Sequence, residues 1–399
     1  MAATGNNIVI VAARRTPIGS FQGMLASLSA TELGACTIRA VLQDAAVDPG
    51  SIDEVLMGNV LQAGLGQAPA RQAARAAGIP DAVGCTTINK VCGSGMKAIM
   101  LGHDMIRAGT ADVVLAGGME SMSNAPYLLP GARGGYRYGH QQTLDHMVYD
   151  GLQNVDDGEV MGAFAERCAD QYRFTREQQD AYATESVRRA RTAMQEGAFS
   201  NEICAVTGPP GQGGELLLVE DEQPLRCKVE KIPELQPAFR TPGGTVTAAS
   251  SAAISDGAAA VVLTRADMAM SFGLQPLARI VAHASHARAP ADFTTAPGPA
   301  IRQLHEVSGW TDAAVDLYEI NEAFAVVVMA AMRDLDLDYD RVNVNGGACA
   351  LGHPIGASGA RLVVTLIHAL RRRNLKRGIA ALCIGGGEAT AMALELVST

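Results

Sequence analysis

The stretch NVNGGACALGHPIGASGAR, residues 343–361, holds five glycines and one histidine, His353, which is followed directly by Pro354. Glycine loses more backbone freedom on folding than any other residue, so this density indicates backbone held close to another group. His353 lies outside any apolar helical or strand period. A loop histidine satisfied by backbone would fit, but the setting favours a functional role.

A similar pattern occurs earlier in the chain. GSGMKAIMLGHDMIRAGTADVVLAGGMES (93–121) can be laid beside GASGARLVVTLIHALRRRNLKRGIAALCIGGGEAT (356–390). Each runs from a glycine loop through an apolar helix and a polar turn to an apolar strand that ends in glycines. The repetition predicts two similar α/β halves whose glycine loops meet at a shared site.

Hydrophobic spacing and capping residues predict the elements around these stretches. We expect strands over 8–13, 54–62, 111–121 and 258–264, and helices over 31–47, 93–109 and 175–197, with Thr31 capping the first helix and Gly109 ending the second. Residues 122–250 carry more charge, proline and glycine, which predicts an inserted segment with a surface loop at 208–215. The predicted division is 1–121 plus 251–270, the insertion 122–250, and 271–399.

The composition argues against several classes of protein. The 399 residues are 48% hydrophobic, with a net charge of −9 and a pI near 5.4, which argues against a nucleic-acid-binding protein. The eight cysteines form no CxxC pair and no zinc spacing, so we expect free thiols and no metal. The longest apolar runs are too short for a membrane span, and the N-terminus lacks a secretory pattern. We therefore expect a cytoplasmic protein.

Cys92 precedes the helix predicted over 93–109. A thiol at a helix N-terminus feels the positive end of the dipole, which predicts a lowered pKa, and free N–H groups there can bind an oxyanion. A small buried cysteine in a tight turn fits equally well. A third reading is the dinucleotide fingerprint, since GSGMKA is followed by Asp112; the poor strand before it argues against an NAD-linked oxidoreductase.

Two further residues lie where strands end. Cys383, in ALCIGGGEAT, ends an apolar strand before three glycines, where a thiol can face a cleft, although a core cysteine fits too. Asn321, in YEINEAFA, ends a strand and precedes a helix, and its simplest interpretation is a helix N-cap.

Together these stretches resemble the thiolase family. The resemblance spans nearly the whole chain in order, in AARRTPIGSFQG, GNVLQAGLGQAPARQAA, NKVCGSGMKAI, AGGMESMSNAPY, TVTAASSAAISDGAAA, NEAFA, NVNGGACALGHPIGASGAR and CIGGGE. It implies an α/β thiolase fold, with duplicated βαβαβαββ halves in five layers (αβαβα) and an inserted loop domain. It also implies a homotetramer, a dimer of dimers, that acts on acyl-CoA thioesters and needs no further cofactor.

The resemblance implies a reversible Claisen condensation, most like that of an acetyl-CoA acetyltransferase in fatty acid metabolism. Cys92 would be the acylated nucleophile, His353 its general base, and Cys383 the acid–base at the α-carbon. His353 and a water held by Asn321 would form one oxyanion hole, and the N–H groups of Cys92 and Gly385 the other.

The same resemblance suggests where coenzyme A binds. Arg226 and Lys228 lie in the region that meets its adenosine part, and Met161, Ser250 and Ser251 lie near the acyl or pantetheine end. The chain departs from many members at three positions, where it has Val160 for histidine, Ala252 for serine and Glu388 for methionine. These departures leave the acyl chain length open.

Two other functions are compatible with the resemblance to the thiolase family. One is a broader 3-ketoacyl-CoA thiolase of β-oxidation. The other is a non-catalytic acyl-CoA-binding subunit that kept the fold, against which the presence of all four motif residues, Cys92, Asn321, His353 and Cys383, argues.

Overall fold

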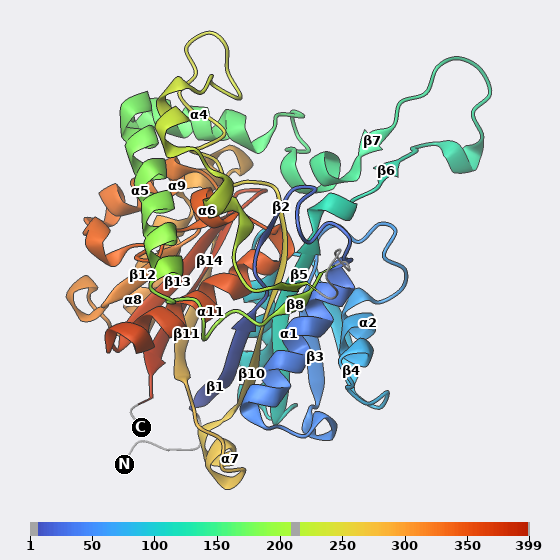
Figure 1. Cartoon of the computed structure of the whole chain (residues 1–399), viewed down its shortest axis with the longest axis vertical. Coiled ribbons are helices and arrows are strands. Elements are labelled where there is room, and N and C mark those ends of the chain that lie inside the picture. The colour runs from blue at the N-terminus through green and yellow to red at the C-terminus, as the bar shows by residue number, and fades with distance from the viewer. Residues whose placement is uncertain (1–6, 209–215, 398–399) are drawn as a thin grey trace.

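The computed structural model describes residues 7–208 and 216–397, and its centre is a ten-stranded mixed sheet (Figure 1). The strands run in the order β12-β13-β14-β11-β1-β10-β5-β3-β4, with the short β2 (Gly19–Ser20) paired to β10. The two halves of the sheet meet where β1 pairs with β11 through only two residue pairs, Val9 with Arg279 and Ile10 with Ala278.

The N-terminal half follows the predicted βαβαβαββ order. Its elements are β1 (Ile8–Arg15), α1 (Ala30–Ala45), β3 (Glu54–Gly58), α2 (Pro69–Ala76), β4 (Gly84–Ile88), α3 (Ser94–Ala108), β5 (Val113–Ser121) and β10 (Ser255–Arg265). Strand β3 runs parallel to β4 and β5, whereas β10 is antiparallel to β1 and β5.

The C-terminal half repeats this order with one strand reduced. Its elements are β11 (Ala278–Ala287), α8 (Pro297–Ser308), β12 (Leu317–Ile320), α9 (Ala325–Leu335), α10 (Ala348–Leu351), α11 (Ile355–Arg373), β13 (Arg377–Ile384) and β14 (Glu388–Leu396). The counterpart of β4 is a single parallel bridge between Tyr318 and Val342. Each half therefore has the same strand neighbours, and the predicted duplication is confirmed.

The helices and the two halves of the sheet stack in five layers, as expected: outer helices, one half, the central helices, the other half, and outer helices. Helices α1 and α2 cover the outer face of the N-terminal half, and α8 covers that of the C-terminal half together with α9. Helices α3 and α11 pack on each other between the halves, and their apolar side chains belong to one core with side chains of β5, β10, β13 and β14. The central core thus needs both halves of the chain.

The glycines of the two repeated stretches allow α3 and α11 to approach closely. A Cβ on Gly95 would lie 2.9 Å from the backbone nitrogen of Ala360, and one on Gly359 would lie 2.5 Å from that of Met96. Any larger residue would push the helices apart. The glycine density of 343–361 predicts backbone held close to another group, and at Gly359 that group is the backbone of α3.

Most predicted helices appear within a few residues of their expected ends. Gly109 ends α3 with φ 74°, and Thr175 begins α5 (Arg176–Gln195) with a capping box to Gln178. Two capping predictions are wrong. The N-cap of α1 is Ser29 rather than Thr31, because Ser29 forms the capping box with Glu32, and α9 begins after Phe324, so Asn321 is not its cap.

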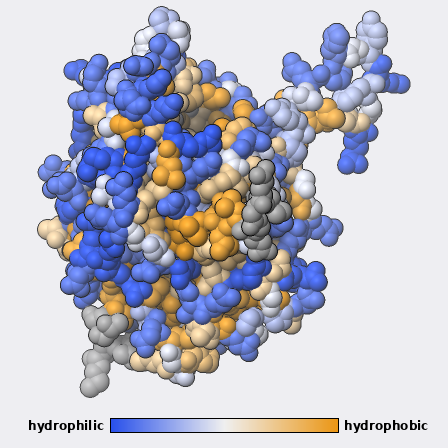
Figure 2. Space-filling model, viewed as in Figure 1, coloured by the Kyte–Doolittle hydropathy of each residue, from blue (hydrophilic) through white to orange (hydrophobic). Residues whose placement is uncertain are grey.

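The segment predicted as an insertion contains mostly short elements. They are the 3₁₀ turn Met122–Asn124, β6 (Tyr127–Leu128), the 3₁₀ turn Ala132–Gly134, β7 (Leu144–Asp145), the π-helix Met147–Leu152, α4 (Met161–Tyr172), α5, β8 (Val206–Thr207), β9 (Leu217–Leu218), α6 (Glu222–Arg226) and the 3₁₀ helix Val229–Glu234. The arm carrying β6 and β7 projects from the body and is largely hydrophilic (Figures 1 and 2).

Buried ion pairs attach this segment to the N-terminal half. Arg15 on β1 is fully buried and bonds Asp221 and Glu202, at 2.7 and 2.6 Å. The predicted loop 208–215 falls outside the described residues except at Gly208, and the predicted domain boundaries remain a prediction. None of the helices in the described ranges is long and apolar enough to cross a membrane.

Candidate active site

Cys92 lies in the turn between β4 and α3 and is partly buried. Side chains hold this turn, because Asn89 Oδ1 accepts a hydrogen bond from the Val91 N–H at 2.9 Å and Ser94 Oγ donates to the Val91 carbonyl at 2.6 Å. Val91 itself has φ 47°, an uncommon and strained conformation for a β-branched residue. The turn is thus fixed at a cost, as is usual where a reactive group must be presented.

The Cys92 thiol is not the thiolate that its place before a helix predicted. Burial raises its pKa to about 11, and the backbone N–H groups of Gly385 and Cys92, which favour the thiolate, offset this only in part. Desolvation outweighs the helix dipole here. The same two N–H groups converge on the sulfur and therefore on any acyl group bound to it.

His353 is held by its backbone and by one ring nitrogen. Its N–H donates to the Ala253 carbonyl at 3.0 Å, and Nδ1 lies 2.5 Å from Ser358 Oγ, whose hydroxyl donates to the Pro354 carbonyl at 2.9 Å. With the hydroxyl proton directed at Pro354, Nδ1 carries the imidazole proton and Nε2 presents a lone pair. Burial lowers the pKa of His353 to about 3, so the ring is neutral.

Asn321 lies beside the free nitrogen of this ring. Its Nδ2 is 3.4 Å from His353 Nε2, and its backbone N–H donates to the Ala381 carbonyl on β13 at 2.9 Å. The side chain is fully buried, and Oδ1 has no hydrogen-bond partner among the described residues. A buried amide oxygen of this kind is suited to bind a water or a polar substrate atom.

Cys383 lies near the end of β13 and is fully buried. Its pKa is raised well above the ordinary value, first by burial and next by Cys92, since two neighbouring thiols resist ionising together. Gly385 follows two residues later. A Cβ on it would lie 3.4 Å from the sulfur of Met161 and 3.7 Å from the Val91 side chain, which places α4 and the Cys92 turn against the same loop.

The structure therefore brings together Cys92, Cys383, Gly385 and Met161 on one side, and His353 with Asn321 on the other. The two sides adjoin, because Asn321 is bonded to Ala381 and because Cys92 packs in a cluster with Ile355, two residues after His353. Cys92 comes from the N-terminal half, while His353, Asn321 and Cys383 come from the C-terminal half. These groups can transfer an acyl group to sulfur and move protons beside it.

Two carboxylates that we did not predict fix the surrounding loops. Glu120, buried at the end of β5, accepts hydrogen bonds from the backbone N–H groups of Gly356 at 2.9 Å and of Val60 at 3.0 Å, so it joins the His353 loop to the N-terminal half. Its pKa is raised to about 7, by burial against those donors. A glutamate in the apolar stretch VVLAGGMES was the available signal.

Glu322 does the same within the C-terminal half. It accepts from the hydroxyls of Tyr182 at 2.9 Å and Ser186 at 2.7 Å, and from the N–H of Cys349 at 3.0 Å. These bonds attach the glycine-rich stretch to α5. The stretch NEAFA had drawn attention to Asn321 alone, although its neighbour forms more contacts.

The residues predicted to bind coenzyme A are dispersed. Arg226 is exposed and paired with Glu222 at 3.0 Å, and Lys228 is exposed at the start of a 3₁₀ helix. The Ser250 and Ser251 hydroxyls both bond the Thr247 carbonyl, at 3.3 and 2.7 Å. Each hydroxyl thus donates its proton inside its own turn and could meet a ligand only as an acceptor, so contact of these two serines with coenzyme A stays a prediction.

The three departures lie around the same region. Val160 is the partly exposed residue before α4, and the Ala252 N–H donates to the Ala323 carbonyl at 3.0 Å. Glu388, the first residue of β14, forms an ion pair with Lys90, two residues before Cys92. This pair connects the two loops that carry the Cys92 thiol and the Gly385 N–H.

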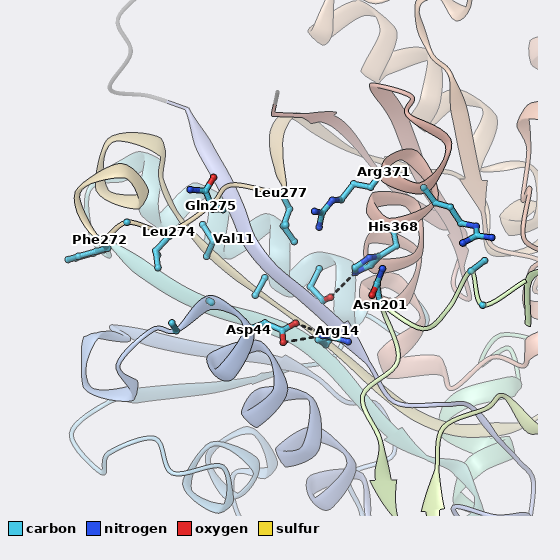
Figure 3. A pocket seen from close by; sticks show the side chains of 18 residues that line it. Val11, Arg14, Asp44, Asn201, Phe272, Leu274, Gln275, Leu277, His368 and Arg371 are labelled. Carbon is cyan, nitrogen blue, oxygen red and sulfur yellow. Dashed lines mark hydrogen bonds and ion pairs between the residues drawn. The ribbon is translucent and has the colours of Figure 1, made fainter. Parts of the chain in front are cut away.

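A cavity separate from these residues lies near the C-terminal end of α11. It measures about 830 Å³ and is lined by residues that include Arg14, Asp44, His368 and Arg371 (Figure 3). His368 and Arg371 are near the C-terminal end of α11, roughly 20 Å along the helix from its start beside His353. None of the predicted site residues lines it.

The dinucleotide alternative for GSGMKA is wrong. A Cβ on Gly93 would lie 2.4 Å from Ile384, and the space beside Gly95 is filled by Ala360, so protein atoms occupy the places that a pyrophosphate would need. Asp112 is exposed and pairs with Arg265 at 2.9 Å.

Comparison with known proteins assigns nearly the whole chain to one family. Family models described as the thiolase N-terminal and C-terminal domains match residues 8–267 and 274–396. An acetyl-CoA acetyltransferase of Pseudomonas aeruginosa is 50% identical over 97% of this chain and 99% of its own, and acetyl-CoA acetyltransferase 2 of Arabidopsis thaliana is 49% identical over 98% and 97%.

A solved structure agrees as well. The Acat5 thiolase of Ascaris suum, in complex with coenzyme A, superposes with a TM-score of 0.92 at 46% identity, covering 98% of this chain and 100% of that one. Because the two family models together cover nearly the whole chain and these relatives match it from end to end, the chain belongs to the thiolase family.

Proposed function

We propose that this thiolase is an acetyl-CoA acetyltransferase, which condenses two acetyl-CoA molecules to acetoacetyl-CoA and coenzyme A and also catalyses the reverse reaction. The observation that carries the proposal is the convergence of two thiols, a neutral imidazole and a buried amide on one site built from both halves. The names of the relatives, which are about 50% identical over nearly the full length, support acetyl-CoA as the substrate.

In the first half-reaction, Cys92 Sγ attacks the carbonyl carbon of acetyl-CoA. The S–H proton passes to His353 Nε2 as the C–S bond forms, since a thiol with a pKa of about 11 beside a neutral imidazole is not ionised beforehand. The oxygen that becomes negative is met by the Cys92 and Gly385 N–H groups. Collapse expels the coenzyme A thiolate, which takes a proton from the Cys383 thiol, so that acetyl-Cys92, a Cys383 thiolate and a His353 protonated on both nitrogens remain.

In the second half-reaction, Cys383 removes a proton from the methyl carbon of a second acetyl-CoA. The enolate oxygen is met by His353 Nε2 and by a water bound to Asn321, while the carbanion attacks acetyl-Cys92. The C–S bond to Cys92 breaks, acetoacetyl-CoA leaves, and the Cys92 sulfur takes back the proton held by His353 Nε2, which restores two thiols and a neutral imidazole. Because Ser358 Oγ donates to the Pro354 carbonyl and accepts from His353 Nδ1, Nδ1 keeps its proton and Nε2 is the nitrogen that gains and loses one.

Acyl transfer is tested by mass spectrometry of the intact protein and of its Cys92 peptide after incubation with acetyl-CoA. The expected result is one acetyl group on Cys92 in the wild type and none in Cys92→Ala. Cys36→Ala is the matched control, since Cys36 lies on α1 away from the site. Acetyl on the Cys92→Ala protein at any site residue would overturn the nucleophile assignment.

Substrate class is tested separately by steady-state thiolysis. We expect kcat/KM for acetoacetyl-CoA to exceed that for a 3-ketoacyl-CoA of about eight carbons by more than tenfold. A rate for the longer substrate equal to or above that for acetoacetyl-CoA would favour the broader 3-ketoacyl-CoA thiolase.

We further propose that the protein is a cytoplasmic homotetramer of fatty acid metabolism. The family resemblance is the main support, and the exposed edge strand β4 offers unpaired backbone to a second copy. One relative is named a mitochondrial enzyme, from Bos taurus, so location differs among relatives. Light scattering of the purified protein should give four chains per particle, and a monomer would contradict the proposal.

A further inference from the structure

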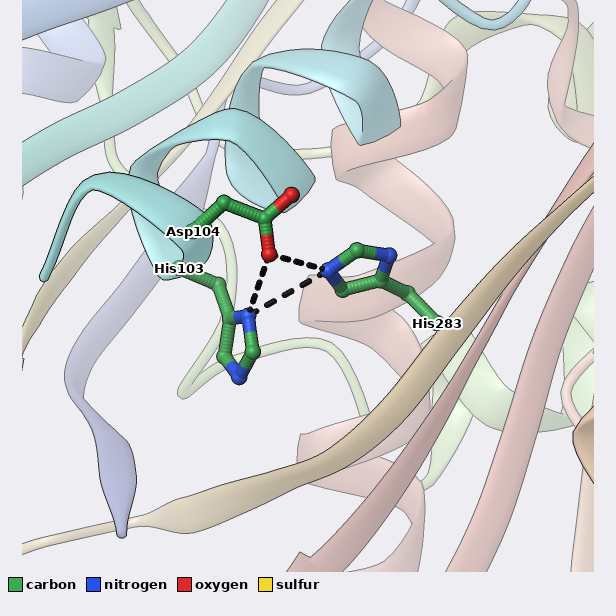
Figure 4. A group of neighbouring side chains, drawn as sticks. All are labelled: His103, Asp104 and His283. Atoms are coloured by element: carbon green, nitrogen blue, oxygen red, sulfur yellow. Dashed lines mark hydrogen bonds and ion pairs between the residues drawn. The ribbon is translucent and has the colours of Figure 1, made fainter. Parts of the chain in front are cut away.

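Three side chains far from the catalytic residues meet where the two halves of the chain join. His103 and Asp104 lie in the last turns of α3, at the opposite end of that helix from Cys92, and His283 lies on β11. Figure 4 shows the three side chains pointing toward one another. The proposed acyl-transfer function does not use them.

Their ligand atoms form a nearly equilateral triangle. His103 Nδ1 lies 3.1 Å from Asp104 Oδ1, His283 Nε2 lies 2.9 Å from the same oxygen, and the two nitrogens are 3.2 Å apart. The His103 side chain is 7% exposed, that of His283 17% and that of Asp104 51%, so the triangle is open to solvent on its Asp104 side.

Hydrogen bonds alone cannot satisfy this triangle. Each side of the triangle needs a proton at one end and a lone pair at the other. With three corners, at least one side must join two atoms of the same kind. If both histidines donate to Asp104, their two N–H groups face each other at 3.2 Å. If only one donates, a nitrogen lone pair faces a carboxylate lone pair instead.

A metal ion resolves the conflict because it accepts all three lone pairs. Ligands at about 2.1 Å from a metal lie about 3.0 Å apart at right angles and about 3.4 Å apart in a tetrahedron, close to the observed sides. Two imidazoles and a carboxylate suit Zn²⁺ and neighbouring divalent transition ions. The positive charge of Arg107, four residues after His103 on the same helix, opposes a cation here.

We infer that His103, Asp104 and His283 form a binding site for a divalent transition-metal ion of the Zn²⁺ type. The ion would join α3 of the N-terminal half to β11 of the C-terminal half. Such a link stabilises the docked arrangement of the halves without entering the reaction.

The test is a Co²⁺ titration of the metal-free, full-length protein, followed by its visible spectrum and by thermal unfolding. Co²⁺ is chosen because binding by thiolates produces an intense charge-transfer band, which separates this site from Cys92 and Cys383. We expect one Co²⁺ per chain without that band, and a higher unfolding temperature when it is bound.

His283→Gln and Asp104→Asn should each weaken binding at least tenfold and abolish the thermal shift, while acetyl transfer by the metal-free variants stays at the wild-type rate. His286→Gln, on the same strand, is the matched control and should bind as the wild type does. Unchanged affinity in both site variants, a thiolate band at the first equivalent, or no binding by the wild type would each overturn the inference.

Discussion

The hydroxyl of Ser358 lies 2.5 Å from Nδ1 of His353, within the first turn of α11, and donates its own proton to the Pro354 carbonyl. The base of the proposed reaction therefore has its proton position set by a residue only five positions away. Ser358 is buried, and its hydroxyl contacts His353 Nδ1 and the Pro354 carbonyl. It acts through His353 as a positioning residue.

Ser358→Ala should lower kcat by at least about tenfold, because Nδ1–H loses its acceptor and the ring can reorient or change tautomer. KM for acetyl-CoA and the unfolding temperature should change little. Histidine nitrogen NMR of the variant should show a changed balance between the two tautomers. Wild-type kcat with the alanine, or equal loss in Ser358→Thr, which keeps the hydroxyl, would contradict this role.

The Cys383→Ser variant distinguishes the proposed role of Cys383, which is proton removal at the α-carbon, from that of Cys92, which is acyl transfer. A serine hydroxyl is far less acidic than a thiol, so we expect condensation to fall by roughly 10²–10⁴-fold. The variant should still be acetylated at Cys92, since that half-reaction breaks no C–H bond. Acetyl incorporation and exchange of the acetyl-CoA methyl protons with deuterated solvent are measured on one preparation. Exchange at the wild-type rate would assign the carbon base to another group, such as His353.

The resting thiol of Cys92 should react slowly with iodoacetamide at neutral pH. Burial raises its pKa to about 11, so the thiolate fraction, and with it the alkylation rate, should grow about tenfold per pH unit between pH 7 and 10. Peptide mapping gives this rate for Cys92 alone, with partly buried Cys227 as an internal comparison. A plateau already reached by pH 8 would show that the helix dipole, not burial, controls the sulfur.

Gly359→Ala should destabilise the protein by about 1–3 kcal/mol or more. Its Cβ would lie 2.5 Å from the backbone of Met96, so α3 and α11 would have to separate. Gly134→Ala is the control, since a Cβ there meets nothing within 4 Å. Chemical denaturation of both variants measures the free energy of unfolding. Equal stability of the two would mean that the helix crossing tolerates a methyl group.

Much of the architecture was predictable because it repeats. Residues 93–121 and 356–390 carry the same succession of loop, helix and strand, and both form it. The reduction of one strand to the bridge at Val342 was not predictable, since a single bridge leaves no periodic signal. The caps of α1 and α9 were misplaced for a related reason: several polar residues could cap, and tertiary packing selects one.

The positions of the candidate residues were predictable from the sequence, whereas the pKa of Cys92 was not, and the roles of these residues stay predictions. Cys92, Asn321, His353 and Cys383 were all found from their motifs and lie together, yet the Cys92 pKa was predicted in the wrong direction. Local sequence shows a helix start but not the depth of burial. Glu120 was missed because its key contact, with Gly356, joins residues 236 positions apart.

Cys92 precedes α3 and His353 precedes α11, so the two residues occupy equivalent places in the two halves. This equivalence limits how the site can arise by duplication. The two helices are counterparts in a duplicated pattern, so an arrangement with identical halves would present either two nucleophiles or two bases to the same point. Catalysis requires that the copies differ there while still fitting each other at Gly95 and Gly359. The proposed chemistry thus depends on the interface between two similar halves that differ at this point. We expect neither half alone to be an enzyme.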